Sequence, residues 1–267
     1  MSVIPTAADP TLALAHLLHS CERVLLFTGA GASTEAGIPD YQSPGGVWSR
    51  YRNVTCTEFL EDPALRRVFW ERGRELYPPI YSAHPNPAHY LAPWLLAEGR
   101  LAGVVTQNVD GLHQATGLPL EWLVELHGNA HRVRCLGCSW GCARQEVQQR
   151  LEAGDLTPEC PGCGGILKPT TVAFGEPLPP EQTERARQMA SGCDLCLVIG
   201  SALKVYPAAY VPHWARKAGA CLAILNLEPT RLDDLCEVVV HARAGATLRR
   251  ILEPLSKHEQ RQGQVWP

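Results

Sequence analysis

The chain has 267 residues, 45% of which are hydrophobic, and a formal net charge of −3 at pH 7. This length suits one large core or one core with a small satellite domain, and the near balance of charge gives no reason to expect binding to nucleic acid or to an anionic membrane. The start of the chain lacks the pattern of a signal peptide, and no apolar run approaches the roughly 18 residues of a membrane span. We therefore expect a cytoplasmic protein whose eleven cysteines are thiols or metal ligands.

Apolar segments alternate with segments of helical pattern along most of the chain. Several of the apolar segments have no polar residue, as expected of parallel strands that are covered on both faces. This alternation predicts an α/β fold with a doubly wound parallel sheet. The expected strands are 24–28, 101–106, 195–200, 221–227 and 237–241, and the expected helices are 11–21, 86–98, 180–191, 208–218 and 247–255.

A glycine-rich loop follows the first expected strand. Residues 29–42 read GAGASTEAGIPDYQ, and a turn of this kind offers free N–H groups to a phosphate. The glycine spacing matches neither the Rossmann G-x-G-x-x-G pattern nor the Walker pattern. An ordinary NAD oxidoreductase is therefore disfavoured, and the pattern alone leaves the ligand of this loop open.

Two stretches interrupt the alternation. Residues 43–82 are rich in aromatic side chains and are expected to be helical, whereas residues 134–165 are rich in Cys, Gly and Pro and are expected to form an insertion. The insertion contains two C-x-x-C pairs, Cys135/Cys138 and Cys160/Cys163. Four thiolates in a tetrahedron select zinc, and a zinc site with all four positions filled by the protein is structural.

The remaining cysteines are not expected to bind metal. Cys142 lies near the two pairs but has no partner at C-x-x-C spacing. Cys193 and Cys196 do have that spacing, yet they lead into an apolar strand, where residues three apart point to opposite faces. We interpret these two as buried thiols.

Two polar segments also indicate chemistry. TQNVDGLH begins at Thr106, at the carboxyl end of the strand 101–106, where ligands of doubly wound sheets bind. A polar turn with internally satisfied side chains is the alternative. ELHGN surrounds His127, just before the cysteine insertion. A lone histidine is most often merely solvated or hydrogen-bonded, but one in a cleft between domains would suit a general base.

Seven motifs occur in a fixed order: GAGASTEAGIPDY, TQNVDGLH, ELHGN, the paired C-x-x-C motifs, KPTTVAFGE, GSALKVYP and NLEPT. Together they resemble the sirtuin family, in its bacterial type, from about residue 12 to residue 254. The resemblance implies an NAD-dependent protein lysine deacylase, represented by its catalytic domain. It also implies a Rossmann-like large part, about 11–42, 83–133 and 166–256, and a small part with the helical stretch 43–82 and the zinc insertion 134–165.

The resemblance further implies roles for individual residues. His127 corresponds to the catalytic base, which takes a proton from a ribose hydroxyl of NAD after the acyl oxygen has displaced nicotinamide. Asn108 corresponds to the residue that positions the ribose and a water molecule, and Asp110 to the residue that holds the nicotinamide carboxamide. With these two, the residues expected to bind NAD are Gly29, Ala30, Gly31, Ala32, Asp40, Tyr41, Gln42, Gln107, Gly200, Ser201, Asn226, Glu228 and Ala244.

The segment KPTTVAFGE is implied to bind the acyl-lysine protein substrate by added β-structure, with the acyl chain passing Phe174. The implied products are deacylated lysine, nicotinamide and O-acyl-ADP-ribose. The residues expected to contact the substrate are Val172, Phe174, Gly175 and Glu176.

The chain departs from the family pattern in two places. Most sirtuins continue Gly-Ile-Pro-Asp with Phe-Arg, where this chain has Tyr41 and Gln42. Loss of the Arg charge beside an anionic cofactor lends weight to an alternative, a mono-ADP-ribosyltransferase or NAD hydrolase on the same scaffold. Sirtuins that remove acidic acyl groups carry a Tyr-x-x-Arg pair, whereas the matching place here, 70–73, reads WERG. We therefore expect an acetyl or a longer neutral acyl group.

A third hypothesis is a zinc-containing binding module without catalysis. The set Asn108, Asp110 and His127 disfavours it, because a pure scaffold has no need of an amide, a carboxylate and an imidazole in these motifs.

Overall fold

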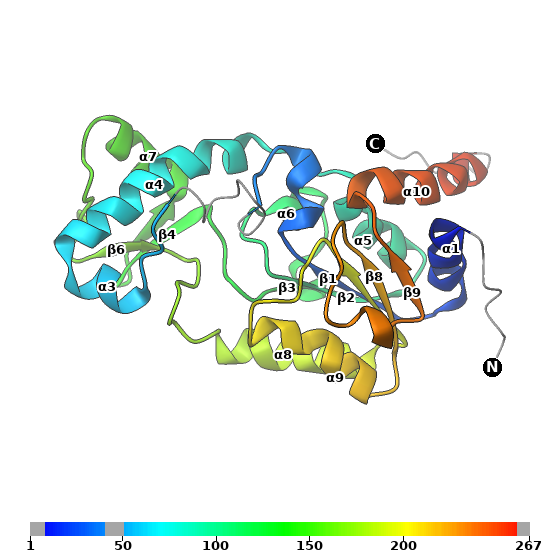
Figure 1. Cartoon of the computed structure of the whole chain (residues 1–267). Helices are drawn as coiled ribbons and strands as arrows, with labels where there is room; N and C mark the ends of the chain where they lie inside the picture. The colour runs from blue at the N-terminus through cyan, green and yellow to red at the C-terminus, as the bar shows by residue number, and fades with distance from the viewer. Residues whose placement is uncertain (1–8, 41–50, 261–267) are drawn as a thin grey trace.

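A six-stranded parallel sheet forms the centre of the large part of the molecule (Figure 1), in a computed structural model that describes residues 9–40 and 51–260. The strand order is β3–β2–β1–β7–β8–β9. In chain order this is the Rossmann arrangement, which reverses direction between β1 and β7, so the predicted Rossmann-like fold is confirmed. The strands are β1 (Val24–Thr28), β2 (Leu101–Thr106), β3 (Leu123–Glu125), β7 (Leu195–Ile199), β8 (Cys221–Leu225) and β9 (Val238–Val240).

Helices cover both faces of this sheet (Figure 1). One hydrophobic core joins the sheet to α1 (Pro10–Ser20), α5 (Pro87–Ala97) and α10 (Ala244–Gln260), and a second core joins the opposite face to α8 (Pro180–Gly192) and α9 (Val211–Lys217). Burial on both faces explains why β1, VLLFT, contains no charged residue and is buried at every position.

Local sequence signals fix the helix starts. The Asp9 side chain accepts from Thr11 N before α1, and the Asn86 side chain accepts from Ala88 N before α5; both helices begin with proline. Side-chain caps of this kind satisfy N–H groups that have no partner inside the helix, and proline fits the first helical position because it lacks an N–H.

The small part has its own sheet and its own core. Its antiparallel sheet, β5–β4–β6, consists of β5 (Gly141–Ala143), β4 (Arg132–Cys135) and β6 (Leu167–Pro169). The helices α3 (Cys56–Glu61), α4 (Pro63–Ser82) and α7 (Arg144–Glu152) accompany it. A separate hydrophobic cluster, with Trp70 fully buried, joins α3, α4, α7 and this sheet.

Several elements differ from the sequence expectations. The expected helix 208–218 is a 3-10 turn, Ala208–Tyr210, followed by α9. Strand β3, helix α6 (Leu112–Ala115) and the whole small sheet were not expected; each is only three or four residues long, too short for a periodic signal. Strands β4 and β6 carry the small sheet from residue 132 to residue 169, beyond the predicted insertion 134–165.

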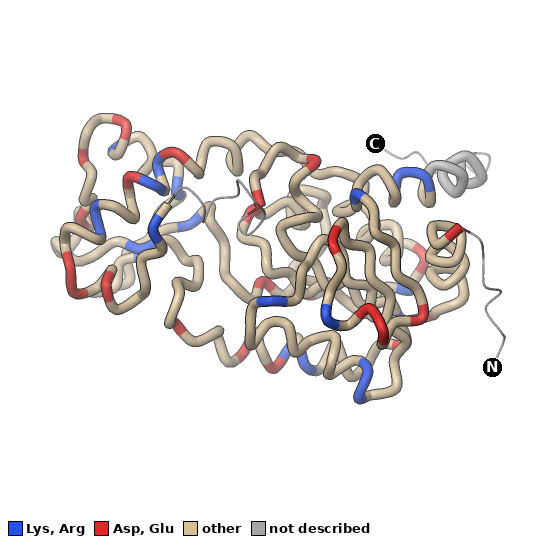
Figure 2. Tube along the Cα trace, viewed as in Figure 1, with Lys and Arg blue, Asp and Glu red and all other residues tan. Residues whose placement is uncertain are grey.

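Charge is mixed over the surface. In the view of Figure 2, Lys and Arg positions are interspersed with Asp and Glu positions on both the large and the small part. None of the helices in the described residues combines the length and the apolar character that crossing a membrane demands.

Candidate active site and metal centre

A cavity of about 650 Å³ lies where the carboxyl ends of the central strands meet the small part. This is the edge where a doubly wound sheet binds ligands. Of the predicted site residues, those lining the cavity are Gly29, Ala30, Gly31, Asp40, Gln107, Asn108, His127, Val172, Phe174, Gly175, Glu176, Gly200, Ser201, Asn226, Glu228 and Ala244. Ala32 and Asp110 are buried beside it. The predictions for Tyr41 and Gln42 lie outside the described residues.

The glycines of the loop allow two backbones to approach. Gly31 N donates to Gly200 O at 2.8 Å, so the loop after β1 is tied to the turn after β7. A Cβ on Gly31 would lie 2.8 Å from Gly200 Cα, and Gly200 itself has a φ of 61°. Side chains at these positions would clash or be strained. The glycine at position 31 is thus explained by its close contact with Gly200.

Ser33 holds two side chains of the TQNVDGLH segment, the amide of Asn108 and the carboxylate of Asp110. The Asn108 side-chain N–H₂ donates to Gly29 O at 3.1 Å and to Ser33 Oγ at 3.0 Å, and Ser33 Oγ donates to Asp110 Oδ2 at 2.7 Å. Leu112 N donates to the other Asp110 oxygen at 3.0 Å. These bonds fix both side chains at the cavity's edge. The sequence reasoning did not include Ser33, although a serine inside a glycine-rich loop was a signal for it.

Two buried histidines support this network: His113, the last residue of TQNVDGLH, had no predicted role of its own, and His89 lies outside the predicted motifs. His113 Nε2 lies 3.1 Å from Thr28 Oγ1, and His89 Nε2 lies 3.3 Å from Ser33 Oγ. The two rings meet edge to face, with their centroids 5.1 Å apart. Burial lowers the pKa of His89 and holds that of His113 well below its ordinary value. Both imidazoles are therefore neutral at pH 7.

His127 has the geometry of a general base. Its Nδ1–H donates to Gln107 O at 2.9 Å, because a carbonyl oxygen can only accept. The other ring nitrogen, Nε2, is then unprotonated and free to take a proton. Burial lowers the pKa of His127, and the bond to Gln107 offsets only part of that effect. The imidazole is therefore in its basic form at neutral pH.

The far end of the cavity is built from the ends of β7 and β8 and the start of α10. The Gln107 amide donates to Ser201 Oγ at 2.8 Å, which connects the β2 and β7 edges. The Asn226 amide, at the end of β8, donates to Glu228 O at 2.6 Å. These contacts place four predicted NAD residues along one rim.

The segment predicted to bind substrate joins the two parts of the molecule. Val172 N donates to His127 O at 2.8 Å, and on the side of the small part Cys56 N donates to Phe174 O at 2.8 Å. Phe174 is 45% exposed. The carboxylate of Glu176 accepts from Ala173 N at 2.9 Å and pairs with the buried Lys168 at 2.8 Å.

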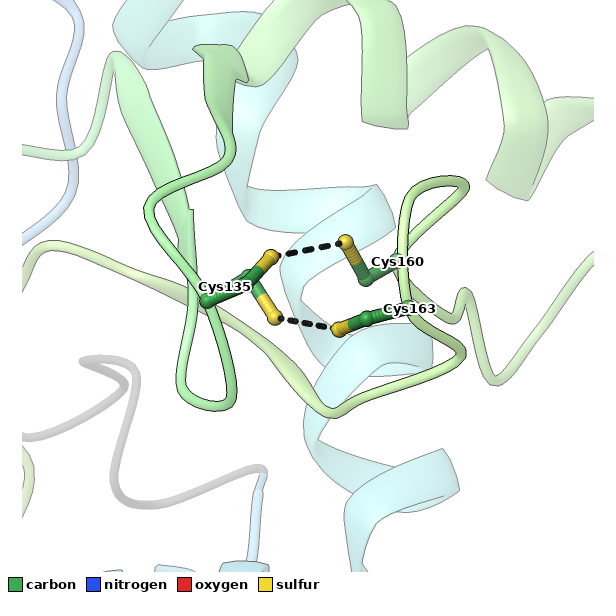
Figure 3. Close-up of side chains that lie close together, drawn as sticks. Cys135, Cys160 and Cys163 are labelled. Carbon is green, nitrogen blue, oxygen red and sulfur yellow. Dashed lines mark hydrogen bonds between the residues drawn. The ribbon is translucent and has the colours of Figure 1, made fainter.

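The four cysteines of the insertion converge, and Figure 3 labels three of them, Cys135, Cys160 and Cys163. Their sulfur atoms all lie within 4.8 Å of one another, with Cys135–Cys163 at 3.5 Å and Cys138–Cys160 at 3.7 Å. A tetrahedron with zinc–sulfur bonds of about 2.3 Å needs sulfurs roughly 3.8 Å apart, so the set fits a structural zinc ion, as predicted.

Three other cysteines that the sequence analysis discussed lie outside this cluster, and the expected burial of Cys193 and Cys196 is confirmed. Cys142 lies on β5, outside the four-sulfur cluster. Cys193 and Cys196 are buried in the core beneath the sheet. Burial raises the pKa of Cys193 to about 12, so this thiol is protonated at neutral pH.

Known proteins match most of the chain. The sequence profile of the Sir2 family matches residues 29–207. An NAD-dependent protein deacetylase of Thermodesulfovibrio yellowstonii is 43% identical over 233 residues, 87% of this chain and 90% of that protein. NAD-dependent protein deacylase 2 of Pyrobaculum aerophilum is 41% identical over 247 residues, 91% of this chain and 95% of that protein. A solved complex of Sir2 with a deacetylated p53 peptide and 3′-O-acetyl-ADP-ribose has a TM-score of 0.84 at 33% identity, covering 91% of this chain and 98% of that one.

These matches extend over both the sheet and the cysteine insertion. The chain therefore belongs to the Sir2 family, the sirtuins, and the resemblance inferred from its seven motifs is confirmed. Relatives of similar length in this family are named NAD-dependent protein deacetylases or deacylases.

Proposed function

We propose that this chain is an NAD-dependent protein lysine deacylase, in which His127 is the general base and the cavity holds NAD beside an acyl-lysine side chain. The products are deacylated lysine, nicotinamide and O-acyl-ADP-ribose. The observation that carries the proposal is the state of His127: its Nδ1–H is held by Gln107 O at 2.9 Å, and burial lowers its pKa. A base with its free nitrogen at a cavity of about 650 Å³ is placed for proton transfer.

The cavity fits NAD on the chemistry of its lining. Gly29, Ala30, Gly31 and Gly200 place backbone with small or no side chains on the cavity lining, as close approach of a pyrophosphate requires, with Ala32 in the same turn. At the other end, Asn108 on the lining and Asp110 buried beside it carry an amide and a carboxylate, which can bind ribose hydroxyls and a carboxamide. The adenosine half of NAD is proposed to contact Ser201, Asn226, Glu228 and Ala244, which also line the cavity. Asp40, Tyr41 and Gln42 complete the proposed set.

NAD supplies the ADP-ribosyl group that accepts the acyl chain, with nicotinamide as leaving group. The protein's own groups orient the reacting molecules and transfer protons. Gln107 fixes the His127 tautomer through its backbone carbonyl, while its side chain is anchored on Ser201. His127 then accepts the proton of a ribose hydroxyl at Nε2. Asn108, held between Gly29 O and Ser33 Oγ, orients the ribose and a water molecule.

The substrate peptide is proposed to lie as an added strand along Val172, Phe174, Gly175 and Glu176. The exposed Phe174 then contacts the acyl-lysine side chain. The hydrogen bond from Val172 N to His127 O holds the start of this segment next to the proposed base. Sir2 structures hold deacetylated and acetylated peptides.

The division of the chain into a large part (11–42, 83–133 and 166–256) and a small part (43–82 and 134–165) is proposed to separate two tasks. The Rossmann-like sheet binds NAD, and the zinc insertion shapes the substrate side of the cleft. The expected cytoplasmic location stays a prediction.

Nicotinamide release by the purified zinc-loaded protein tests the function. We expect release that requires an acetyl-lysine peptide and falls by about 10²–10⁴ in His127→Ala, the usual effect of removing a positioned base. His16→Ala, an exposed histidine on α1, is the matched control and should leave the rate unchanged. Release without peptide would move the assignment to an NAD hydrolase or ADP-ribosyltransferase. No release at all would exclude catalysis on NAD.

A further inference from the structure

The small part contributes two charged side chains to the cavity that the mechanism does not use, Arg72 and Arg144, and only Arg144 is buried. Arg144, the first residue of α7, lines the cavity and is 2% exposed. Its backbone N–H donates to His131 O at 2.8 Å, which fixes where the side chain starts. Burying a guanidinium costs folding free energy unless an anion or a hydrogen-bond acceptor pairs with it. The groups around Arg144 therefore indicate its role.

Aromatic rings hold the faces of this guanidinium. Its central carbon lies 5.3 Å from the centre of the Trp70 ring and 4.6 Å from that of Tyr77. Cation–π contacts of this kind stabilise the flat faces. They leave the N–H groups in the plane of the guanidinium untouched, because those point outward from its edge.

The two terminal nitrogens on the edge of the guanidinium have no hydrogen-bond partner in the described part of the chain. Both terminal nitrogens of Arg144 are buried without a hydrogen bond, and no described carboxylate lies within ion-pair distance of them. Trp70 Nε1, a second N–H donor, is likewise buried and unbonded. Burial lowers the pKa of Arg144 to about 10, so the group is still charged at pH 7. A paired fork of donors matches a carboxylate in shape and charge.

Gly73 lies beside this edge. It lies in the middle of α4, where glycine weakens a helix, and it lines the same cavity. The nearest atom to a Cβ built on Gly73 is Arg144 Nη2, at 3.5 Å. The absence of a side chain there leaves room beside the donors for part of a ligand.

We propose that Arg144 binds the carboxylate at the end of an acidic acyl group carried by the substrate lysine, such as a succinyl group. The proposal rests on the deacylase function and names its acyl class. Arg144 and the acyl-lysine contact Phe174 line one cavity, so an acyl chain that passes Phe174 can extend toward α7. The anion cannot be the pyrophosphate if that group lies at Gly29, Gly31 and Gly200, on the large part. This differs from the neutral acyl group expected from the sequence, because the WERG stretch lacks the Tyr-x-x-Arg pair but Arg144 supplies a charge from a different helix, α7.

The test compares two peptides of identical sequence, one with succinyl-lysine and one with acetyl-lysine. We expect the wild-type protein to act on both. Arg144→Met should lower kcat/KM for the succinyl peptide by about tenfold or more, mainly through KM, since a hydrogen bond to a charged group is lost. It should change kcat/KM for the acetyl peptide by less than about twofold. Arg67→Met, an exposed arginine of α4 paired with Glu71, is the control and should alter neither.

Two further variants guard against a folding defect. Arg144→Lys keeps the charge but loses the fork, and should keep part of the preference. Arg144→Gln should behave as Arg144→Met does. Thermal unfolding of Arg144→Met should not begin earlier than that of the wild-type protein, because an unpaired buried charge has been replaced by an apolar chain.

The outcomes separate this inference from the function beneath it. Acetyl removal without succinyl removal, or a succinyl-to-acetyl ratio that Arg144→Met leaves unchanged, would overturn the inference and leave the deacylase standing. Loss of both reactions in the wild-type protein would overturn the function. If Arg144 instead governs acetyl-lysine peptides with a neighbouring glutamate, the carboxylate comes from the peptide and the acyl assignment is wrong.

Discussion

At the scale of single residues, burial sets the protonation state of the imidazoles around the cavity. His89, His113 and the proposed base His127 all have a pKa lowered by burial. A lowered pKa keeps a histidine neutral, which is the form that accepts a proton. The fixed Nδ1–H of His127 adds the second requirement, a free nitrogen on the cavity side.

The neutral state of His127 predicts how kcat/KM depends on pH on the acid side of neutrality. The active form of His127 is deprotonated, so kcat/KM rises with pH through the pKa of this group. Because burial lowers that pKa, the midpoint of the limb should fall below the ordinary value of about 6.5. The measurement is kcat/KM for an acetyl-lysine peptide between pH 5 and pH 8. A midpoint above about 6.5 would contradict the assignment of His127 as base.

The same profile needs a folding control. His89 and His113 are buried and neutral, so the unfolded chain binds more protons than the native one as pH falls below about 6.5. Native stability therefore decreases toward acid pH. Circular dichroism at each pH separates loss of the fold from protonation of the base.

At the scale of elements, the strand β6 and the substrate segment are connected by one buried ion pair. Lys168 on β6 is 2% exposed and lies 2.8 Å from Glu176. Burial acts to raise the pKa of Glu176, but the bond from Ala173 N and the contacts with Lys168 together lower it. The pair connects the zinc-bearing small sheet to the residues proposed to grip the peptide.

Lys168→Met should therefore loosen the substrate segment. Breaking one partner of a buried pair costs on the order of 3–5 kcal/mol, and partial rearrangement around the half-buried Glu176 recovers some of this. We expect KM for the peptide to rise about tenfold or more, with KM for NAD little changed. Initial rates at varied peptide and NAD concentrations measure the two.

Arg134→Met is the matched control, because Arg134 pairs with the same carboxylate at 3.9 Å from an exposed position. Exposed pairs contribute little, so its peptide KM should stay near that of the wild-type protein. Equal effects of both variants would show that total charge near Glu176, and not the buried contact, matters.

The elements also show what the sequence could predict. Four of the five expected strands, with their helices, were predictable because apolar runs and helical periodicity repeat over enough residues, and the fifth, β9, is only three residues long but is apolar throughout. Strand β3 and the small sheet were not predictable, since three or four residues carry no period. The cysteine set was predictable because C-x-x-C spacing is itself the geometry of the ligand site.

The parts of the site that escaped prediction come from distant segments. Ser33, His89 and Arg144 reach the cavity or its network from the loop after β1, from α5 and from α7. Each pattern is ordinary within its own segment; only the fold places Ser33 against Asp110, or Arg144 beside Gly73. The roles of these residues therefore required spatial information.

At the scale of the whole molecule, two bodies of structure have separate cores. The cores of the large part lie on the two faces of the six-stranded sheet. The core of the small part contains two of the metal-site cysteines, Cys135 and Cys160, packed with Trp70 and Leu151. Its sheet strands are only three or four residues long, so this core depends on a ligand that holds its loops together.

We therefore predict that loss of zinc unfolds the small part before the large one. Cys138→Ser, which removes an exposed ligand, should lower zinc content and produce an early unfolding transition, because binding of the metal contributes directly to folding. Deacylation should be lost with it, since β6 anchors the substrate segment through Lys168. Calorimetry with metal analysis measures the transition and the zinc content together.

Cys142→Ser provides the comparison, because Cys142 lies on β5 outside the four-sulfur cluster and should leave both zinc and activity intact. Most of the far-UV circular dichroism should survive the early transition of Cys138→Ser, since the six-stranded sheet and its helices have their own cores. A single concerted transition in the zinc-free protein would mean that the two bodies fold as one unit. The substrate segment, hydrogen-bonded to both His127 and Cys56, would then be the connection that couples them.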